Sequence, residues 1–192
     1  MDTQAPVQIS AEITPNPHTL KFNVNRTLVV SGSLNYPDRE TARGVLLAER
    51  LFVIKDVLGV MIGRSFVTVT KSPEGDWQPM IQPITDTLKS LLSSNEVLFP
   101  QSEGSGASAE RTADPASGEI EKRIREILDN EIRPAVAMDG GDITFYGYDN
   151  GIVTLHLQGS CSSCPSSIMT LKMGVESRLK QSIPEVREVV QL

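Results

Sequence analysis

Residues 152–168 read IVTLHLQGSCSSCPSSI and join three features: an alternating strand, a turn with two cysteines and a helix start. In the strand, Val153, Leu155 and Leu157 share one face, and polar side chains occupy the other, which is typical of a half-buried strand. Pro165 suits the first position of a helix, where its missing N–H costs nothing. The two cysteines are therefore predicted to lie in a turn between a strand and a helix.

The surrounding sequence extends this unit in both directions. Residues 143–146 and 152–158 flank Asp149-Asn150-Gly151, a strong hairpin signal. Before them, residues 120–132 carry an apolar stripe at helical spacing, which we expect to end near Arg133-Pro134. After the cysteines, residues 168–179 predict a second helix, and a last short strand follows. The predicted order is α-β-β-α-β.

Residues 101–118 contain no Val, Ile, Leu, Met or aromatic residue. Such a segment buries too little apolar surface to offset its ordering entropy, so we expect a flexible linker. It divides the chain into a domain over residues 1–100 and a domain over residues 119–192. The predicted fold class is α+β, with two small mixed domains joined by this linker.

The front domain has a mixed pattern of strands and helices. Residues 7–14 and 19–24 read as strands separated by a proline-rich turn, and residues 57–70 read as a hairpin. Asp38 and Asp76 are each expected to cap a helix. This part contains no cysteine and no phosphate-binding glycine loop, so the sequence indicates no chemistry here.

Composition excludes several functional classes. The chain has 192 residues, 18 Lys plus Arg against 24 Asp plus Glu, and a formal net charge of -6. An acidic chain lacks the electrostatic attraction that nucleic-acid binders rely on. No apolar run reaches the ~20 residues of a membrane span. The N-terminus reads as neither a secretory signal nor a basic presequence. We therefore expect a cytoplasmic protein, although an organellar protein that has been trimmed would look the same.

Cys161 and Cys164 are the only cysteines and have C-x-x-C spacing. Unpaired N–H groups and the dipole at a helix N-terminus stabilise thiolates, which are ligands for iron–sulfur clusters and for zinc. Such sites usually take four ligands and one chain supplies two, so the count points to a homodimer that shares one metal centre. A thioredoxin-like pair normally follows an aromatic residue and encloses Gly-Pro, whereas Ser-Ser lies between these cysteines.

Residues 159–167, with the preceding residues 133–143, resemble the C-terminal domain of the NifU/Nfu family. Residues 14–22 and 66–71 resemble the Nfu-type N-terminal domain. The resemblance implies a non-enzymatic scaffold or carrier that holds a labile cluster, usually [4Fe-4S] and possibly [2Fe-2S], on the paired C-x-x-C loops of a homodimer. It further implies that Cys161 and Cys164 are the cluster ligands. Upstream assembly proteins would supply the cluster and apo iron–sulfur proteins would accept it.

Two other functions stay open at this point. The cysteines would form a dithiol/disulfide pair in an oxidoreductase, which needs no iron. They would also serve a zinc-bridged interaction module, whose metal would withstand chelation that strips a labile cluster.

Several nearby residues have simpler interpretations than ligation. His156 lies on the polar face of its strand, and His18 lies in a turn without a partner in the sequence, so both are expected at the surface. Residues 139–142 (Asp-Gly-Gly-Asp) read as a turn that needs glycine's conformational freedom, and the alternative is that they shape the surroundings of the cluster or contact a donor protein. Met169 and Met173 are expected to fill the core or an interface.

Overall fold

A computed structural model describes residues 6–30, 32–94, 98, 115–162 and 165–192. The chain forms two compact units, Met1–Glu103 and Gly104–Leu192, hereafter the N-terminal and C-terminal units. Most of the expected linker lies outside the described residues, and its last four positions belong instead to helix α3 (Pro115–Ile127). The linker's boundaries stay a prediction. None of the described helices has the length and apolar character needed to cross a membrane.

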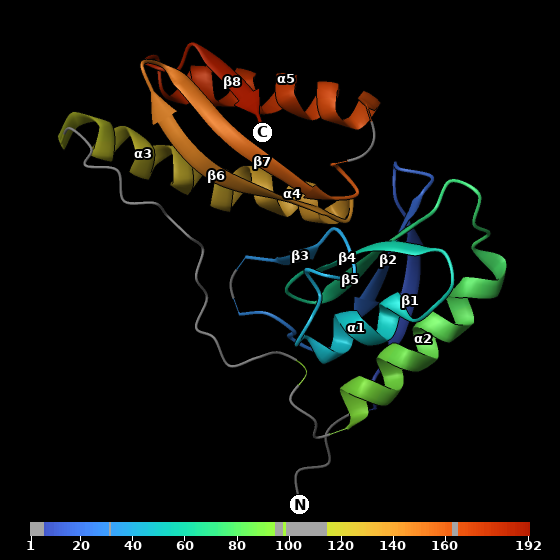
Figure 1. The fold of residues 1–192 in the computed structure, drawn as a ribbon. Coiled ribbons are helices and arrows are strands. Elements are labelled where there is room, and N and C mark those ends of the chain that lie inside the picture. Colours follow the sequence, from blue (N-terminus) through green and yellow to red (C-terminus); the bar gives the residue numbers. More distant parts are fainter. Residues whose placement is uncertain (1–5, 31, 95–97, 99–114, 163–164) are drawn as a thin grey trace, which may run out of the picture. The chain divides into compact units, whose positions relative to one another are not determined.

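The N-terminal unit contains a five-stranded antiparallel sheet (Figure 1). Its order is β1 (Ile9–Ile13), β2 (Thr19–Val24), β5 (Phe66–Lys71), β4 (Val57–Ile62) and β3 (Leu34–Tyr36). The two strands around the proline-rich turn and the β4–β5 hairpin confirm the sequence predictions. Strand β3 was not predicted, because a three-residue strand is too short to show an alternating pattern.

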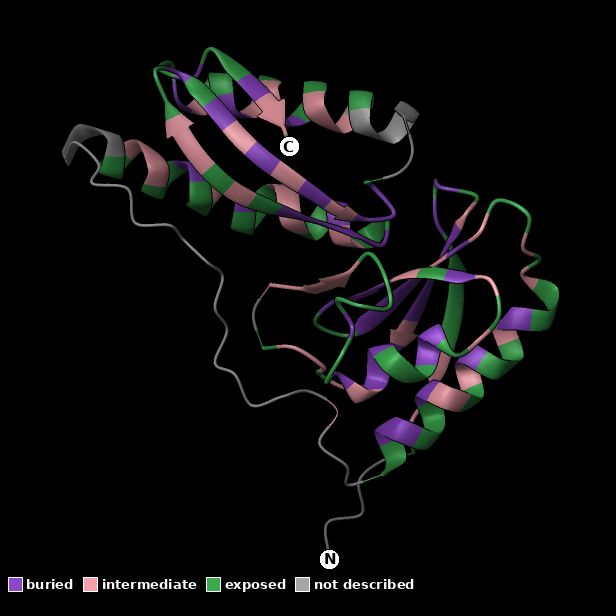
Figure 2. Ribbon diagram, in the orientation of Figure 1, coloured by how far each residue is buried: buried purple, intermediate pink, exposed green. Residues whose placement is uncertain are grey.

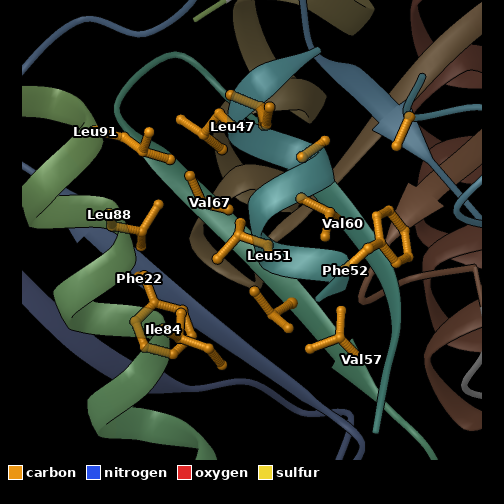
Figure 3. Packing of buried hydrophobic residues seen from close by; sticks show 14 of the residues in the cluster. Phe22, Leu47, Leu51, Phe52, Val57, Val60, Val67, Ile84, Leu88 and Leu91 are labelled. Atoms are coloured by element: carbon orange, nitrogen blue, oxygen red, sulfur yellow. The ribbon is translucent and has the colours of Figure 1, made fainter. Parts of the chain in front are cut away.

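Two helices, α1 (Leu46–Phe52) and α2 (Gln78–Ser93), pack on this sheet. Figure 3 shows Leu51 of α1 and Leu88 of α2 directed into one apolar core with Phe22. The expected helix cap at Asp38 is wrong. Its carboxylate accepts the N–H of Thr41 at 2.8 Å and closes an isolated turn, whereas α1 begins only after Val45.

The C-terminal unit has the predicted α-β-β-α-β order and confirms the α+β class. Its elements are α3, a π-helical turn η1 (Leu128–Ile132), α4 (Arg133–Met138), β6 (Gly141–Asp149), β7 (Ile152–Gly159), α5 (Pro165–Ser182) and β8 (Glu188–Gln191). Strand β7 is central; it pairs antiparallel with β6 and parallel with β8. The parallel pairing requires a crossover, which α5 provides.

The first helix does not end near Arg133-Pro134 as predicted. The chain passes through η1 and continues as α4 to Met138, with Pro134 in the first turn of α4. A π-helical turn shifts the hydrogen-bond register, and proline is tolerated in a first helical turn because the N–H there needs no intrahelical partner. The helical segment therefore runs up to residues 139–142, which we call the glycine turn.

The two faces of β7 differ as the alternation predicted. Val153, Leu155 and Leu157 are buried in the core of the unit, and the residues between them are half-buried, as the alternating colours along β7 show (Figure 2). The β6–β7 hairpin turns at Asn150 and Gly151, whose φ values are 49° and 88°. Positive φ at both central positions matches the twist of hairpin strands. This hairpin brings the start of β6 next to the end of β7.

Candidate metal centre

Cys161 lies two residues beyond the end of β7, in the turn that leads to α5. The turn begins at Gly159, which has φ 66°, and Ser162 donates its backbone N–H to the Gly159 carbonyl at 3.2 Å. Cys161 is only 4% exposed. Cys164 lies outside the described residues. Helix α5 starts at Pro165, as predicted, so the turn directly precedes a helix N-terminus.

The glycine turn is packed against Cys161. Gly141 pairs with Gly159 across the β6–β7 ladder, so the start of β6 faces the cysteine turn. A Cβ atom at Gly141 would lie 2.5 Å from Cys161 Sγ and 3.0 Å from the Gln158 carbonyl oxygen. A side chain at this position would displace the Cys161 sulfur and press on the backbone carbonyl of the paired strand, so Gly141 allows the close approach of the two segments. Gly140, with φ 76°, confirms the predicted need for glycine's conformational freedom in this turn.

Ser160 links the two segments through hydrogen bonds. It is 2% exposed; its hydroxyl donates to the carbonyl of Asp139, and its N–H donates to the carbonyl of Gly140 at 3.2 Å. The same hydroxyl oxygen lies 3.7 Å from Cys161 Sγ. The sequence analysis did not single out Ser160. A serine directly before the first cysteine was the available signal.

Asp142 and Arg133 fix the other end of the glycine turn. Asp142 is 4% exposed, and its Oδ1 lies 3.0 Å from Arg133 Nε. Arg133 also donates to the carbonyl of Ile143 at 2.9 Å and pairs with Asp129 at 2.6 Å. A buried carboxylate that is paired and hydrogen-bonded favours one arrangement of its surroundings. The cysteine turn therefore rests on a segment anchored to helix α4.

The two histidines contact residues outside the cysteine turn. His156 is half-buried on the polar face of β7, with Nδ1 3.3 Å from Gln158 Nε2. His18 is half-buried, and its Nδ1 lies 3.5 Å from Nζ of Lys71, a residue distant in the chain. Within the described residues, no group of three or more His, Cys, Asp or Glu side chains comes together.

Met169 and Met173 are not core residues. They are 65% and 66% exposed and lie one turn apart on α5, the helix that follows the cysteines. Residues at this spacing share one helix face. The core alternative is therefore wrong, and the interface alternative stays a prediction.

Both units of the chain match families of known proteins. Residues 9–95 match the family description "Scaffold protein Nfu/NifU N terminal", and residues 124–190 match "NifU-like domain". The human "NFU1 iron-sulfur cluster scaffold homolog, mitochondrial" is 40% identical over 96% of this chain and 71% of its own length. The Drosophila ananassae protein of the same name is 40% identical, with 64% of its length covered. "NifU-like protein 4, mitochondrial" of Arabidopsis thaliana is 39% identical, with 65% covered.

These names contradict one expectation. The sequence was interpreted as that of a cytoplasmic protein, whereas all three relatives are named mitochondrial. The composition of the first residues was therefore a poor guide to the compartment. The two family matches and the length of the similarity to the human protein show that this chain belongs to the NifU/Nfu family.

Proposed function

We propose that this protein is a non-enzymatic iron–sulfur cluster scaffold, which binds a labile cluster through Cys161 and Cys164 and passes it to apo-proteins. The relatives named iron–sulfur cluster scaffolds support the general role. The proposal extends that role to particular ligands, a cluster type and a transfer mode.

The observation that carries the proposal is the packing of the glycine turn around Cys161 Sγ. A Cβ at Gly141 would lie 2.5 Å from the sulfur, so the absence of a side chain there gives the Cys161 thiol its place against the glycine turn. The donor chemistry also fits the cargo, because cysteine thiolates are the usual protein ligands of iron–sulfur clusters. Hydrogen bonds and packing around such ligands orient them and tune the metal.

The ligand count supports a cluster shared between two copies of the chain. Each chain has two cysteines, and a [4Fe-4S] cluster takes four. We assign the exposed face of Met169 and Met173 to the contact between the copies, because it follows the cysteine turn on α5 and offers apolar surface. A cluster divided in this way is released stepwise, as incoming thiolates of an acceptor replace those of each copy.

Anaerobic reconstitution of the full chain with iron and sulfide tests the proposal. We expect about four irons and four sulfides per dimer. Cys161→Ala and Cys164→Ala should each abolish loading without changing the circular dichroism spectrum. Ser162→Ala is the matched control, since the Ser162 hydroxyl donates to the Gly159 carbonyl at 2.8 Å and is not a proposed cluster ligand. Loading retained by both cysteine variants would exclude the cluster assignment, and a monomer that takes up no sulfide would indicate dithiol or zinc chemistry.

A further inference from the structure

The N-terminal unit holds a buried lysine, Lys71, whose contacts with the described residues are with neutral groups. Lys71, at the end of β5, is 8% exposed. Its Nζ donates to the Ser72 carbonyl at 3.1 Å, lies 3.5 Å from His18 Nδ1 and lies 5.9 Å from the centre of the Trp77 ring. Among the residues that the structure describes, no carboxylate lies within 4.0 Å of this ammonium. Lysines buried to this degree are normally paired with an acid.

Lys21, on the neighbouring strand β2, shows what such pairing looks like in the same unit. It is also 8% exposed and also lies against an aromatic ring, at 5.1 Å from the centre of Phe66. Unlike Lys71, it has an acid beside it, since Glu12 Oε2 lies 3.6 Å from its Nζ. The two lysines thus match in burial and in aromatic contact and differ in the carboxylate.

The neighbours of Lys71 are held in place by their own hydrogen bonds. The Asn16 side chain, in a residue 2% exposed, accepts the His18 N–H at 3.0 Å, and the His18 carbonyl accepts the Lys71 N–H at 2.8 Å. Trp77 Nε1 donates to the Pro17 carbonyl at 3.2 Å. His18 and Trp77 are only half-buried, so the cluster adjoins solvent. It is therefore ordered before any ligand arrives, which lowers the entropic cost of binding.

We propose that Lys71, His18 and Trp77 form a docking site for a side-chain carboxylate in an acidic segment of a partner protein. One ammonium suits one carboxylate, and a partly exposed ion pair alone is worth only about 0–1 kcal/mol. A free small anion would find too few cations here, whereas a protein segment adds contacts with the flanking rings. The site gives the N-terminal unit a role in recognition that is separate from cluster binding by the cysteines.

A stability comparison tests whether Lys71 is retained for binding. Methionine keeps the apolar stem of lysine and removes the charge. If the charge lacks its partner in the isolated protein, Lys71→Met in the full chain leaves Tm unchanged or raises it. Trp77 is the only tryptophan of the chain, so its fluorescence follows unfolding of the N-terminal unit. A fall in Tm of more than about 5 °C would show that the neutral contacts already satisfy Lys71, and would overturn the proposal.

A binding titration tests the ligand class directly. Trp77 fluorescence is followed while a hexaglutamate peptide is added at low salt, with hexaserine as the neutral control. We expect a saturable change with hexaglutamate alone, weakened by added salt. Lys71→Met should lower the apparent affinity about three- to fivefold, as the loss of one partly exposed ion pair predicts, whereas Lys21→Met, the matched control, should leave it unchanged.

Three results would overturn the assignment. These are no fluorescence change through the millimolar range, equal losses in the two lysine variants, and equal binding of glutarate at the same carboxylate concentration. The last would indicate a free small anion instead of a protein segment. None of these results bears on cluster loading, so failure of this proposal and failure of the scaffold proposal are distinguishable.

Discussion

Gly141→Ala is the sharpest test of how the cysteine turn is built. The substitution adds one methyl group at the start of β6, where φ lies outside the left-handed region and causes no backbone strain. The new Cβ would lie 2.5 Å from Cys161 Sγ, 3.0 Å from the Gln158 carbonyl oxygen and 3.2 Å from Cys161 Cβ. The sulfur can rotate away, but the carbonyl belongs to the paired strand and cannot yield without disturbing the ladder.

Two opposing effects set the expected free-energy change. Forcing an extra methyl group into a packed site costs about 1–3 kcal/mol. Replacing glycine by alanine restricts the unfolded chain and returns about 0.4–1 kcal/mol. The central values of the two ranges leave a loss of about 1.3 kcal/mol in the C-terminal unit, together with outward displacement of Cys161.

Gly147→Ala is the matched control, because Gly147 lies on the same strand and a Cβ there meets nothing within 4 Å. It should be neutral or slightly stabilising. The free energy of unfolding of the C-terminal unit is measured in urea, with hydrogen exchange of the β7 amides as the readout. Trp77 fluorescence serves as an internal reference for the N-terminal unit and should not shift. Alkylation of Cys161 by iodoacetamide, measured in a Cys164→Ser background, should be faster in Gly141→Ala. Equal stability and equal alkylation in the two alanine variants would refute the packing argument.

Three further predictions concern the C-terminal unit. Gly174→Ala should stabilise it by about 0.5–1 kcal/mol in urea unfolding, because a Cβ in the middle of α5 meets nothing within 4 Å; a loss of stability would contradict the helix geometry. The Arg178 guanidinium, hydrogen-bonded to Glu131, lowers the pKa of that carboxyl below its usual 4.5. The contribution of this ion pair to the stability of the unit is present above the pKa of Glu131 in the unfolded chain and is lost as pH falls through its lower pKa in the folded chain. Acid unfolding should therefore depend less on pH in Glu131→Gln. An unchanged pH dependence would exclude this pair as a cause. Met169→Glu with Met173→Glu should leave the monomer folded and shift sedimentation of the loaded protein toward monomer; an unchanged dimer would place the interface elsewhere.

Local patterns in the sequence were sufficient for most of the C-terminal unit. The alternation in β7 and the Asn150-Gly151 hairpin depend on residues close in the chain, and both are present in the structure. Pro165 marked the start of α5 for the same reason, since proline fits the first turn of a helix. The position of the cysteine turn between a strand and a helix followed from these features.

Contacts between distant residues were not predictable in the same way. Gly141 and Cys161 are brought together by strand register, which the sequence does not state. Pro134 was read as a helix end because proline usually stops a helix, but the π-helical turn before it allows the chain to continue. The Lys71 cluster combines β5 with the turn around His18, so neither segment alone indicated it.

The burial of Cys161 bears on how a cluster carrier meets two conflicting demands. Its thiol must reach iron and later yield it to an acceptor, yet while no cluster is bound an exposed thiolate would oxidise or bind stray metal. In the described structure the sulfur is covered, and the hydroxyl of Ser160 and the α-carbon of Gly141 lie beside it. Cluster binding through Cys161 therefore requires the side chain to turn outward from this position. Ser160 connects the cysteine turn to the glycine turn, and the Arg133–Asp142 pair anchors the glycine turn to α4. The free-energy cost of moving the Cys161 side chain is therefore set by residues that need not touch the cluster. Faster alkylation of Cys161 in Gly141→Ala would thus measure the restraint that, under the proposed function, opposes cluster loading.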